Sequence, residues 1–548
     1  MRWEEVEPVV KELLEMPINS SEEFRSFINR VTNFFDNVRE EAGWLYIKMT
    51  VNADKEEYAK AYEEFQKNVI ARLKPYEQKI KEKIVENERF APRGYEYMVK
   101  ILRNDVELFR EENVPLQVKE AIMAKNYGTL VGNIEVEFRG EKKTVQQLSV
   151  YLKDPDRSTR ELAWRKRYEG IWEVRDRLNH LFDELKELRH QQALYAGFSN
   201  YRDYMHKLKG RFEYSPEDLY EFHEAVEKEV IPYLVERTKI RQKKLGVDSV
   251  KPWDTVVDVD GKVLKPFSSI DEFVQKTEKA LSKLNSLFAE RLRIMKEKGL
   301  LDLENRKGKA PGGYNHTLPK TGAPFIFMNA VGQTADVRTL FHELGHSMHS
   351  FETLSLPVFY RPHRMEVAEL ASMSMELISM KYWDEFYEDG DLKKAKIEEL
   401  EGTLYFLPWC MTVDAFQHWI YTNPNHTSKE REEYFAYLMD RFNPGVDWEG
   451  LDEEKKTRWL FQLHIFEVPF YYIEYGIAQI GALAIYRNYL ENPEKTLEDY
   501  QKFLAMGCSA PIDEVYKTAG IELNFSRDYL KNIVDFVAGE IEKLEKDM

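Results

Sequence analysis

The chain contains very little cysteine. Cys410 and Cys508 are the only two among its 548 residues. Two thiols are too few to stabilise a chain of this length through a disulfide framework, which excludes the small disulfide-rich secreted folds. We expect both side chains to be buried free thiols, because cysteine outside disulfides is usually buried.

Long apolar runs and an excess of positive charge are also lacking. No run of 18 apolar residues is present, so we expect no transmembrane helix. The first residues, MRWEEVEPVV, carry acids where a signal peptide carries bases, which favours a cytoplasmic protein. Lysine and arginine number 79 against 96 aspartates and glutamates, a net charge of −17. Nucleic acids and anionic membranes are therefore poor partners, because this charge repels both.

Helical periodicity accounts for most of what the chain does contain. Apolar residues recur at helical spacing among many glutamates and lysines in residues 55–87, 158–197 and 216–246. Strand patterns are few and occur at residues 134–145, 254–264 and 323–330, of which the first two predict hairpins. The sequence therefore predicts a mainly α protein. No linker or repeat marks a boundary, but a division at residue 165 separates an N-terminal helical region from the part that holds the chemistry.

The strongest chemical signal is the string His342-Glu343-Leu344-Gly345-His346. Positions i and i+4 lie one above the other on a helix, so both imidazoles can face one metal ion, and Glu343 can reach a water beside it. Composition alone predicts roughly 0.03 such strings in a chain of this length, so chance explains it poorly. Gly345 costs a helix about 1 kcal/mol relative to alanine, and we expect another segment to pack closely against it.

A catalytic zinc site usually has a third protein ligand. The next helical segment, residues 364–383, offers Glu366, Glu369 and Glu376, which recur on one helix face. Spacing does not choose between them, because Glu366 fits as well as Glu369.

A cluster of aromatic residues follows in the segment HIFEVPFYYIEYGIAQIGALAIY, residues 464–486. Tyr472 and Tyr475 lie three residues apart and share a helix face. A tyrosine hydroxyl is a suitable hydrogen-bond donor to a developing oxyanion. Aromatic stripes on helices also pack in cores, so the pattern alone is compatible with either role.

Three strings, TLFHELGHSMHS, EVAELASMSME and HIFEVPFYYIEYGIAQIGA, resemble the oligoendopeptidase F and thimet oligopeptidase family of zinc peptidases. The compact branch with Pz-peptidase and oligoendopeptidase F is the most similar. The resemblance extends from KNYGTLVGNIEVEF to GCSAPIDEVYKTAGI, in the family's order and spacing. It implies a helical ellipsoid with a zincin-type core, a few short strands near the active site, and a deep internal channel. Residues 1–165 would cover this channel, and residues 166–548 would form the zinc peptidase region.

The resemblance also implies roles for the candidate metal ligands. The third zinc ligand of the family is the glutamate of an AE-x-x-S string, which is Glu369 here. His342, His346 and Glu369 would then hold one Zn²⁺ per chain. Glu366 becomes a candidate for orienting a histidine ligand.

The family's catalytic tyrosine pair maps best onto Tyr472 and Tyr475, with His464 as a histidine that contacts substrate. Tyr471 is a further candidate, because the alignment with the larger thimet-type enzymes shifts by one residue. A glycine-rich loop near the substrate cleft corresponds to Gly312, Gly313 and Tyr314. The strand after it, residues 324–329, is predicted to pair its backbone edge with an extended peptide.

These observations predict hydrolysis of internal bonds of short, unstructured oligopeptides, with Glu343 as the general base. The protein would act as a monomer or a small homo-oligomer. One alternative is a zinc exopeptidase, of the carboxypeptidase or dipeptidase kind, that anchors a chain terminus. Another is a non-catalytic peptide-binding protein, against which Glu343 argues because binding alone does not need it.

Overall fold

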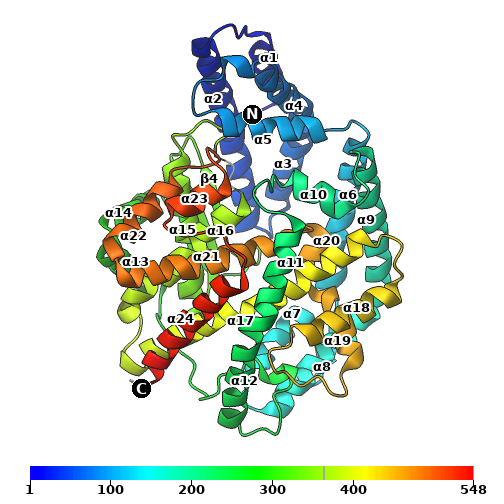
Figure 1. The fold of residues 1–548 in the computed structure, drawn as a ribbon, viewed down its shortest axis with the longest axis vertical. Helices are drawn as coiled ribbons and strands as arrows, with labels where there is room; N and C mark the ends of the chain where they lie inside the picture. The colour runs from blue at the N-terminus through cyan, green and yellow to red at the C-terminus, as the bar shows by residue number, and fades with distance from the viewer. Residues whose placement is uncertain (362–363, 547–548) are drawn as a thin grey trace.

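A computed structural model describes residues 1–361 and 364–546. The chain folds into an elongated, mostly helical molecule with a lobe at one end (Figure 1). The predicted mainly α class is confirmed. Cys410 and Cys508 are both buried free thiols, as expected. None of the helices in the described ranges has the length and apolar character needed to cross a bilayer.

Five helices form the N-terminal lobe, which stands apart at the top of Figure 1. They are α1 (Trp3–Glu15), α2 (Ser21–Val51), α3 (Glu56–Phe65), α4 (Ala71–Glu86) and α5 (Glu96–Leu108). The Ser20 hydroxyl caps α2 by accepting a 3.2 Å hydrogen bond from the Glu23 amide. The lobe has its own hydrophobic core, which also takes in Val358 and Phe359 from the connection between α15 and α16.

The remaining helices pack around a second, larger core. They are α6 (Asn113–Gly132), α7 (Val145–Leu148), α8 (Arg157–Glu173), α9 (Arg175–Tyr195), α10 (Tyr201–Leu208), α11 (Pro216–Ala225), α12 (Ile231–Leu245), α13 (Ile270–Leu284), α14 (Ser286–Glu297), α15 (Thr334–Thr353), α16 (Met365–Ser379), α17 (Asp389–Thr422), α18 (Ser428–Arg441), α19 (Asp452–Thr457), α20 (Leu463–Glu467), α21 (Tyr472–Glu491), α22 (Pro493–Leu504), α23 (Ile512–Thr518) and α24 (Arg527–Lys546). Helices α6 to α8 thus pack with the large body, and a division at residue 165 stays a prediction.

The three predicted helical segments are present with local breaks. Single π-helical turns follow α3 and α11, and the chain continues directly into α4 and α12. The segment at residues 158–197 divides at Val174 into α8 and α9. Gly246 ends α12 with a φ of +64°, a left-handed conformation that glycine adopts without steric cost.

One of the two predicted hairpins is confirmed. Strand β1 (Glu135–Phe138) pairs antiparallel with β2 (Glu141–Thr144) around Arg139-Gly140. Residues 254–264 form no strand, so that hairpin prediction was wrong. The turn at Asp260-Gly261 exists, but the Lys394 ammonium binds its flanks, donating to Asp258 and, at 3.0 Å, to the Lys262 carbonyl. Contacts with α17 replace the backbone pairing.

The second sheet lies beside α15. Its strand order is β3 (Leu301–Glu304), β5 (Ala323–Ala330) and β4 (Tyr314–Leu318), with β5 parallel to β3 and antiparallel to β4. The predicted strand at residues 324–329 is therefore the central strand, and both of its edges are occupied. This corrects the expectation that it offers an edge to a peptide, since the outer edge of the sheet on that side belongs to β4.

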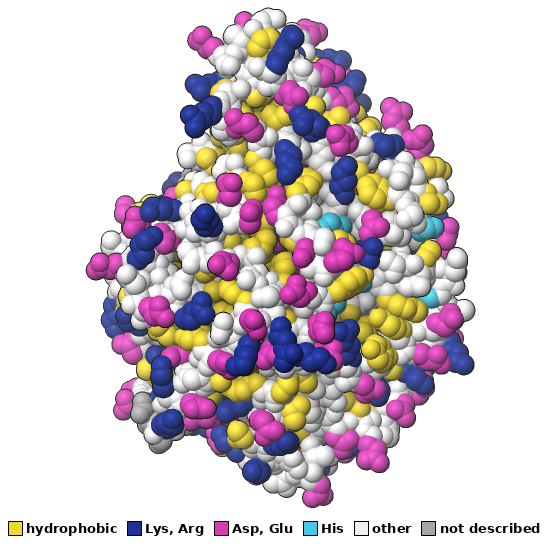
Figure 2. Space-filling view, viewed as in Figure 1, with side chains coloured by type: hydrophobic (Ala, Val, Ile, Leu, Met, Phe, Trp, Pro, Cys, Tyr) yellow, Lys and Arg dark blue, Asp and Glu magenta, His cyan; other side chains and the backbone are white. Residues whose placement is uncertain are grey.

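The visible face of the molecule carries acidic and basic side chains interspersed with apolar ones (Figure 2). The negative charge is not gathered there into one large patch. Such a surface is ordinary for a globular protein and offers no broad electrostatic field for a polyanion on this face.

Candidate metal centre and active site

Three metal-ligating side chains converge where α15 packs on α16. His342 and His346 on α15 and Glu369 on α16 place ligand atoms within 4.8 Å of one another. The Nε2 atoms of His342 and His346 lie 3.4 Å and 3.7 Å from the same oxygen, Glu369 Oε2. The structure therefore brings together the three residues that the sequence predicted as ligands.

The close approach of the two helices depends on Gly345. A β-carbon at this position would lie 2.5 Å from the Ser372 α-carbon and 2.6 Å from the Ala371 carbonyl oxygen. Only glycine permits this packing, which confirms the expectation of a close neighbour. Ser372 in turn donates a 2.9 Å hydrogen bond to Glu369 Oε2 and orients the carboxylate toward the histidines.

Glu376, rather than Glu366, holds a histidine in place. Its Oε1 lies 2.6 Å from His342 Nδ1 and leaves Nε2 free to face Glu369. Helices α15 and α16 run antiparallel, which carries Glu366 one turn past His346. There the Glu366 carboxylate accepts hydrogen bonds from the Tyr214 hydroxyl at 2.5 Å and from Arg364 at 3.1 Å. The structure thus corrects the role predicted for Glu366.

Burial and charge shape the protonation of these groups. Burial lowers the pKa of His342, but the hydrogen bond to Glu376 and the charges of Glu376, Glu369 and Glu343 outweigh it and raise the pKa to about 9. Burial lowers the pKa of His346 to about 4. Burial raises the pKa of Glu343 to about 7, and the charge of Glu369 acts in the same direction.

One carboxylate oxygen beside the three ligands is unsatisfied. Glu343 Oε2 is buried and has no hydrogen-bond partner among the described residues. Buried polar atoms without a partner are rare, because they lose hydration and gain nothing in return. Two imidazoles and a carboxylate, with a further carboxylate aimed into the same space, fit a catalytic divalent metal with an open position.

The tyrosine that contacts a ligand is Tyr471. It directly precedes α21, and its hydroxyl donates a 3.3 Å hydrogen bond to Glu369 Oε1. The Tyr475 ring lies 5.0 Å from the Tyr471 ring. Burial raises the pKa of Tyr475 to about 12, and the charges of Glu369 and Glu343 contribute to the increase. Tyr471 and Tyr475 therefore form the pair that faces the acidic side of the site.

Tyr472 shares the aromatic group, with its ring 4.9 Å from His464 and 5.8 Å from Tyr475, but it also packs toward α17. Its ring lies 5.6 Å from Phe406 on α17, and its backbone carbonyl accepts from the Cys410 thiol at 3.2 Å. Burial, with the nearby Cys410, raises the pKa of the Tyr472 hydroxyl, and a hydrogen bond with Trp409 acts in the opposite direction. The catalytic pairing of Tyr472 with Tyr475 therefore stays a prediction, while Tyr471 is the tyrosine whose hydroxyl contacts Glu369.

His464 lies in the middle of this aromatic group. Its ring stacks on Tyr471 at 6.0 Å and meets Tyr475 edge-on at 6.2 Å. The Gln462 amide lies 2.7 Å from its Nδ1, which fixes the ring orientation. Burial lowers the pKa of His464, so the neutral form is favoured.

The glycine-rich loop connects the sheet to the N-terminal lobe. Gly312 has a φ of +96°, and a β-carbon on Gly313 would lie 3.3 Å from the Phe327 carbonyl oxygen. The Tyr314 ring stacks on Phe327 at 4.9 Å, and its hydroxyl lies 2.6 Å from Thr50 Oγ1 on α2. The Tyr314 side chain therefore joins the lobe to β4.

Sequence reasoning missed the residues that support the site. Asn315 on β4 donates to Ser347 Oγ at 2.6 Å and to the Glu343 carbonyl at 3.3 Å, which fixes the sheet against α15. No pattern in the sequence pointed to Asn315. Glu376 carried a signal, because it lies two helical turns after Glu369, but nothing local separated it from Glu366.

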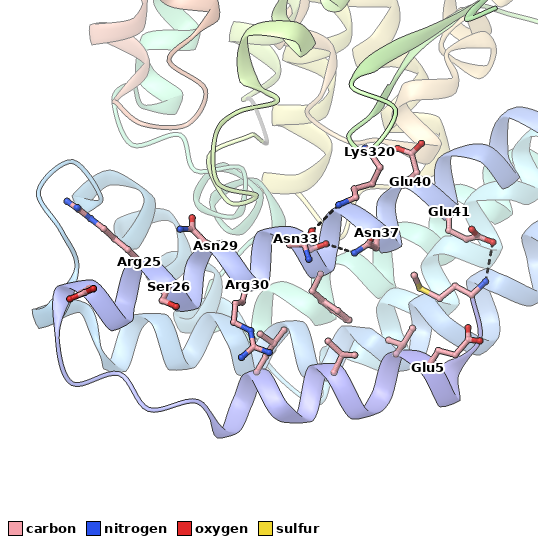
Figure 3. Close-up of a pocket in the computed structure, with 16 residues that line it drawn as sticks. Glu5, Arg25, Ser26, Asn29, Arg30, Asn33, Asn37, Glu40, Glu41 and Lys320 are labelled. Carbon is pink, nitrogen blue, oxygen red and sulfur yellow. Dashed lines mark hydrogen bonds and ion pairs between the residues drawn. The ribbon is translucent and has the colours of Figure 1, made fainter. Parts of the chain in front are cut away.

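A groove of about 1130 Å³ lies on the N-terminal lobe, away from these residues (Figure 3). Helices α1 and α2 form it, with Val6, Leu13 and Phe34 among its apolar residues. On α2, Asn33 accepts a 2.9 Å hydrogen bond from Lys320. None of the predicted site residues lines this groove, so it is separate from the metal centre. The predicted internal channel stays a prediction.

The chain is similar to known peptidases. A family model described as Peptidase family M3 matches residues 150–535. An oligoendopeptidase F homologue of Borreliella burgdorferi is 26% identical over 330 residues, which cover 58% of this chain and 54% of that protein. The group B oligopeptidase PepB of Streptococcus agalactiae is 24% identical over 390 residues, which cover 69% of this chain and 62% of that protein. The chain thus spans between half and two thirds of the length of these two relatives.

A solved structure covers the whole chain. Pz peptidase A with an inhibitor aligns over 100% of this chain and 98% of its own, with a TM-score of 0.91 and 26% sequence identity. The similarity in fold and the family model together confirm the resemblance predicted from the motifs.

Proposed function

The chain belongs to peptidase family M3, and from that premise we propose that it is a zinc-dependent endopeptidase that hydrolyses internal bonds of short, unstructured oligopeptides. One observation carries the proposal. His342, His346 and Glu369 converge within 4.8 Å beside the unpaired carboxylate oxygen of Glu343. The names of the similar proteins, which include oligopeptidases and oligoendopeptidase F homologues, support the substrate class.

His342, His346 and Glu369 would hold the metal. When bound, zinc would supply a Lewis acid that polarises the scissile carbonyl and increases the acidity of the attacking water. Glu343 takes a proton from that water and passes it to the leaving nitrogen. Its position supports this role, because its unpaired oxygen is buried beside the three ligands.

The opposite side of the site stabilises negative charge on the carbonyl oxygen. We assign this role to the hydroxyls of Tyr475 and Tyr471, with His464 beside them as a substrate contact. Burial raises the pKa of Tyr475 to about 12, so the hydroxyl stays protonated and able to donate at neutral pH. The outer edge of β4, beyond Gly312 and Gly313, would bind the peptide backbone by strand addition.

Two further proposals concern the cellular compartment and the oligomeric state. We propose that the protein acts in the cytoplasm, which the two buried free thiols support because an oxidising compartment favours disulfides. We also propose that a monomer or small homo-oligomer is active, since all the residues assigned above come from one chain.

The test uses an internally quenched peptide of about ten residues, with mass analysis of the products before and after chelation. We expect internal cleavage that a chelator abolishes and Zn²⁺ restores, while a folded protein of similar composition stays intact. Products that differ from the substrate only near one end would instead identify an exopeptidase. A protein that holds stoichiometric metal and cuts nothing would be a peptide-binding protein.

A further inference from the structure

The residue before Tyr471 has an unusual backbone conformation. Phe470 has a φ of +60°, and Arg139 is the only other described residue besides glycine with a positive φ. Arg139 lies in the exposed turn of a hairpin, where this conformation is common. Phe470 is buried, and for a side chain of its size the left-handed region is sterically unfavourable. Such strain persists only where the surroundings enforce it.

Two buried side chains hold both peptide groups of Phe470. Gln417 on α17 accepts a 2.8 Å hydrogen bond from the Phe470 amide. Arg211, which follows α10, donates a 2.5 Å hydrogen bond to the Phe470 carbonyl. The Phe470 ring packs against Tyr421 at 5.4 Å and against His418 at 5.5 Å. Backbone and side chain are thus fixed together.

The same segment is held at its other end. Arg189 on α9 is fully buried and donates to the carbonyls of Ile465, at 3.2 Å, and Phe466. Two buried arginines therefore bind the backbone that joins His464 to Tyr471. Burying a charged side chain costs free energy unless the charge is fully paired. The need to join His464 to Tyr471 by a short connection does not by itself explain two buried arginines.

The fixed backbone of Phe470 determines where the next side chain, Tyr471, points. The Tyr471 hydroxyl lies at the end of a long rigid side chain and contacts Glu369. A change in the backbone dihedral angles of Phe470 would reorient the Tyr471 side chain and move its hydroxyl away from Glu369. Arg211 also donates to Glu474 at 2.8 Å, one residue before Tyr475. One guanidinium thus binds the backbone carbonyl before Tyr471 and the side chain of Glu474, the residue before Tyr475.

We propose that Gln417 and Arg211 are positioning residues, which hold Phe470 in a left-handed conformation so that the Tyr471 hydroxyl stays beside Glu369. The inference rests on the proposed peptidase function and deepens it. Neither side chain touches the substrate, and each acts through Tyr471. Misplacement of a reacting group by about 1 Å is enough to lower a rate about 100-fold.

The test is a double-mutant cycle on the zinc-loaded protein with the quenched peptide. Gln417→Leu keeps the size of the side chain and removes the acceptor for the Phe470 amide. We expect kcat to fall between about 10- and 100-fold while KM changes less than about threefold. Tyr471→Phe should lower kcat at least as much. In the Tyr471→Phe background, Gln417→Leu should change kcat by no more than about twofold, because the hydroxyl that Gln417 positions is already absent.

Thr412→Val is the matched control. Thr412 is buried five residues before Gln417 on α17, and its hydroxyl donates to its own helix, at 2.8 Å to the Pro408 carbonyl. This variant should keep the wild-type kcat. Zinc content and the thermal midpoint are measured for every variant, so that a loss of folding or of metal is recognised. If Gln417→Leu does not fold, Arg211→Lys enters the same cycle, because it keeps a positive charge beside Glu474.

Each outcome decides the proposal. Non-additive losses with unchanged zinc content support it. Losses that multiply in the double variant would show a general structural role and overturn it. Wild-type kcat in Gln417→Leu or in Tyr471→Phe would also overturn it, and the proposed peptidase function would stand. If the wild type itself cuts no peptide, the proposed function fails first.

Discussion

The two walls of the metal centre are built in different ways. The wall formed by α15 and α16 consists of regular helices, and the positions of His342 and His346 follow from helix geometry alone. The wall that carries His464 and Tyr471 consists of a short connection with a strained residue. Its supports come from Gln417, 53 residues before Phe470, and from Arg211, 259 residues before it. Local sequence therefore encodes the placement of the two histidines on the first wall, whereas only the complete fold encodes the second wall.

The largest effect is expected on the helical wall. Glu343→Gln keeps the shape of the side chain but removes the group that accepts the proton from water. We expect kcat to fall between about 100- and 10,000-fold, the contribution typical of general acid–base catalysis. Zinc binding should remain stoichiometric by elemental analysis, since Glu343 is not among the three converging ligands.

Glu352→Gln supplies the control for this variant. Glu352 lies later on the same helix and pairs with Arg291 at 2.6 Å, away from the ligands. It should keep the wild-type rate. Full activity in Glu343→Gln would remove the general base from the proposed mechanism.

The second prediction addresses the irregular wall. Tyr475→Phe and Tyr471→Phe each remove a hydroxyl that faces the acidic side of the site, and we expect kcat to fall about 100- to 1000-fold for Tyr475. Tyr472→Phe removes a hydroxyl that lies beside Trp409, whereas the Tyr471 hydroxyl contacts Glu369, so the rate of Tyr472→Phe should stay within about threefold of wild type. Initial rates with the quenched peptide provide the comparison. If Tyr472→Phe were the most damaging of the three, the pair implied by the family resemblance would be right and the pairing of Tyr471 with Tyr475 would be wrong.

Much of the fold and two of the three candidate metal ligands could be predicted from the sequence pattern. Helical class follows from apolar periodicity over many residues. The two histidines follow from the i, i+4 spacing, and the close helix contact follows from a glycine that is otherwise unfavourable inside a helix. Each of these is a property of one continuous segment, and no knowledge of distant contacts is needed.

What could not be predicted depends on how segments meet. The antiparallel packing of α15 and α16 separates Glu376 from Glu366, and no local pattern fixes that direction. Tyr471 and Tyr472 lie four and three residues before Tyr475, so both share a helix face with it and periodicity does not choose. The central place of β5 depends on β3, which pairs with it across a loop.

The third prediction separates the two glutamates by metal affinity. Glu376→Gln removes the negative charge that Nδ1 of His342 contacts at 2.6 Å, and zinc affinity should fall about 10- to 100-fold. Competition with a chromogenic chelator measures the affinity. Glu366→Gln alters a carboxylate held by Tyr214 and Arg364, so it should lower the thermal midpoint and leave zinc affinity unchanged. The reverse pattern would restore the role first predicted for Glu366.

The smallest effect concerns the helix contact beneath the ligands. In Gly345→Ala the new methyl group meets the Ser372 backbone at 2.5 Å, and backbone atoms cannot move aside as a flexible side chain can. Overpacking of this kind costs about 1–3 kcal/mol, while the gain in helix propensity offsets about 1 kcal/mol. Gly539→Ala on α24 gains the same propensity and meets no atom within 4 Å. The thermal midpoint of the metal-free protein should therefore fall for Gly345→Ala and rise for Gly539→Ala. Equal increases in both variants would mean that α16 can retreat without cost, and the precise placement of Glu369 would then need another explanation.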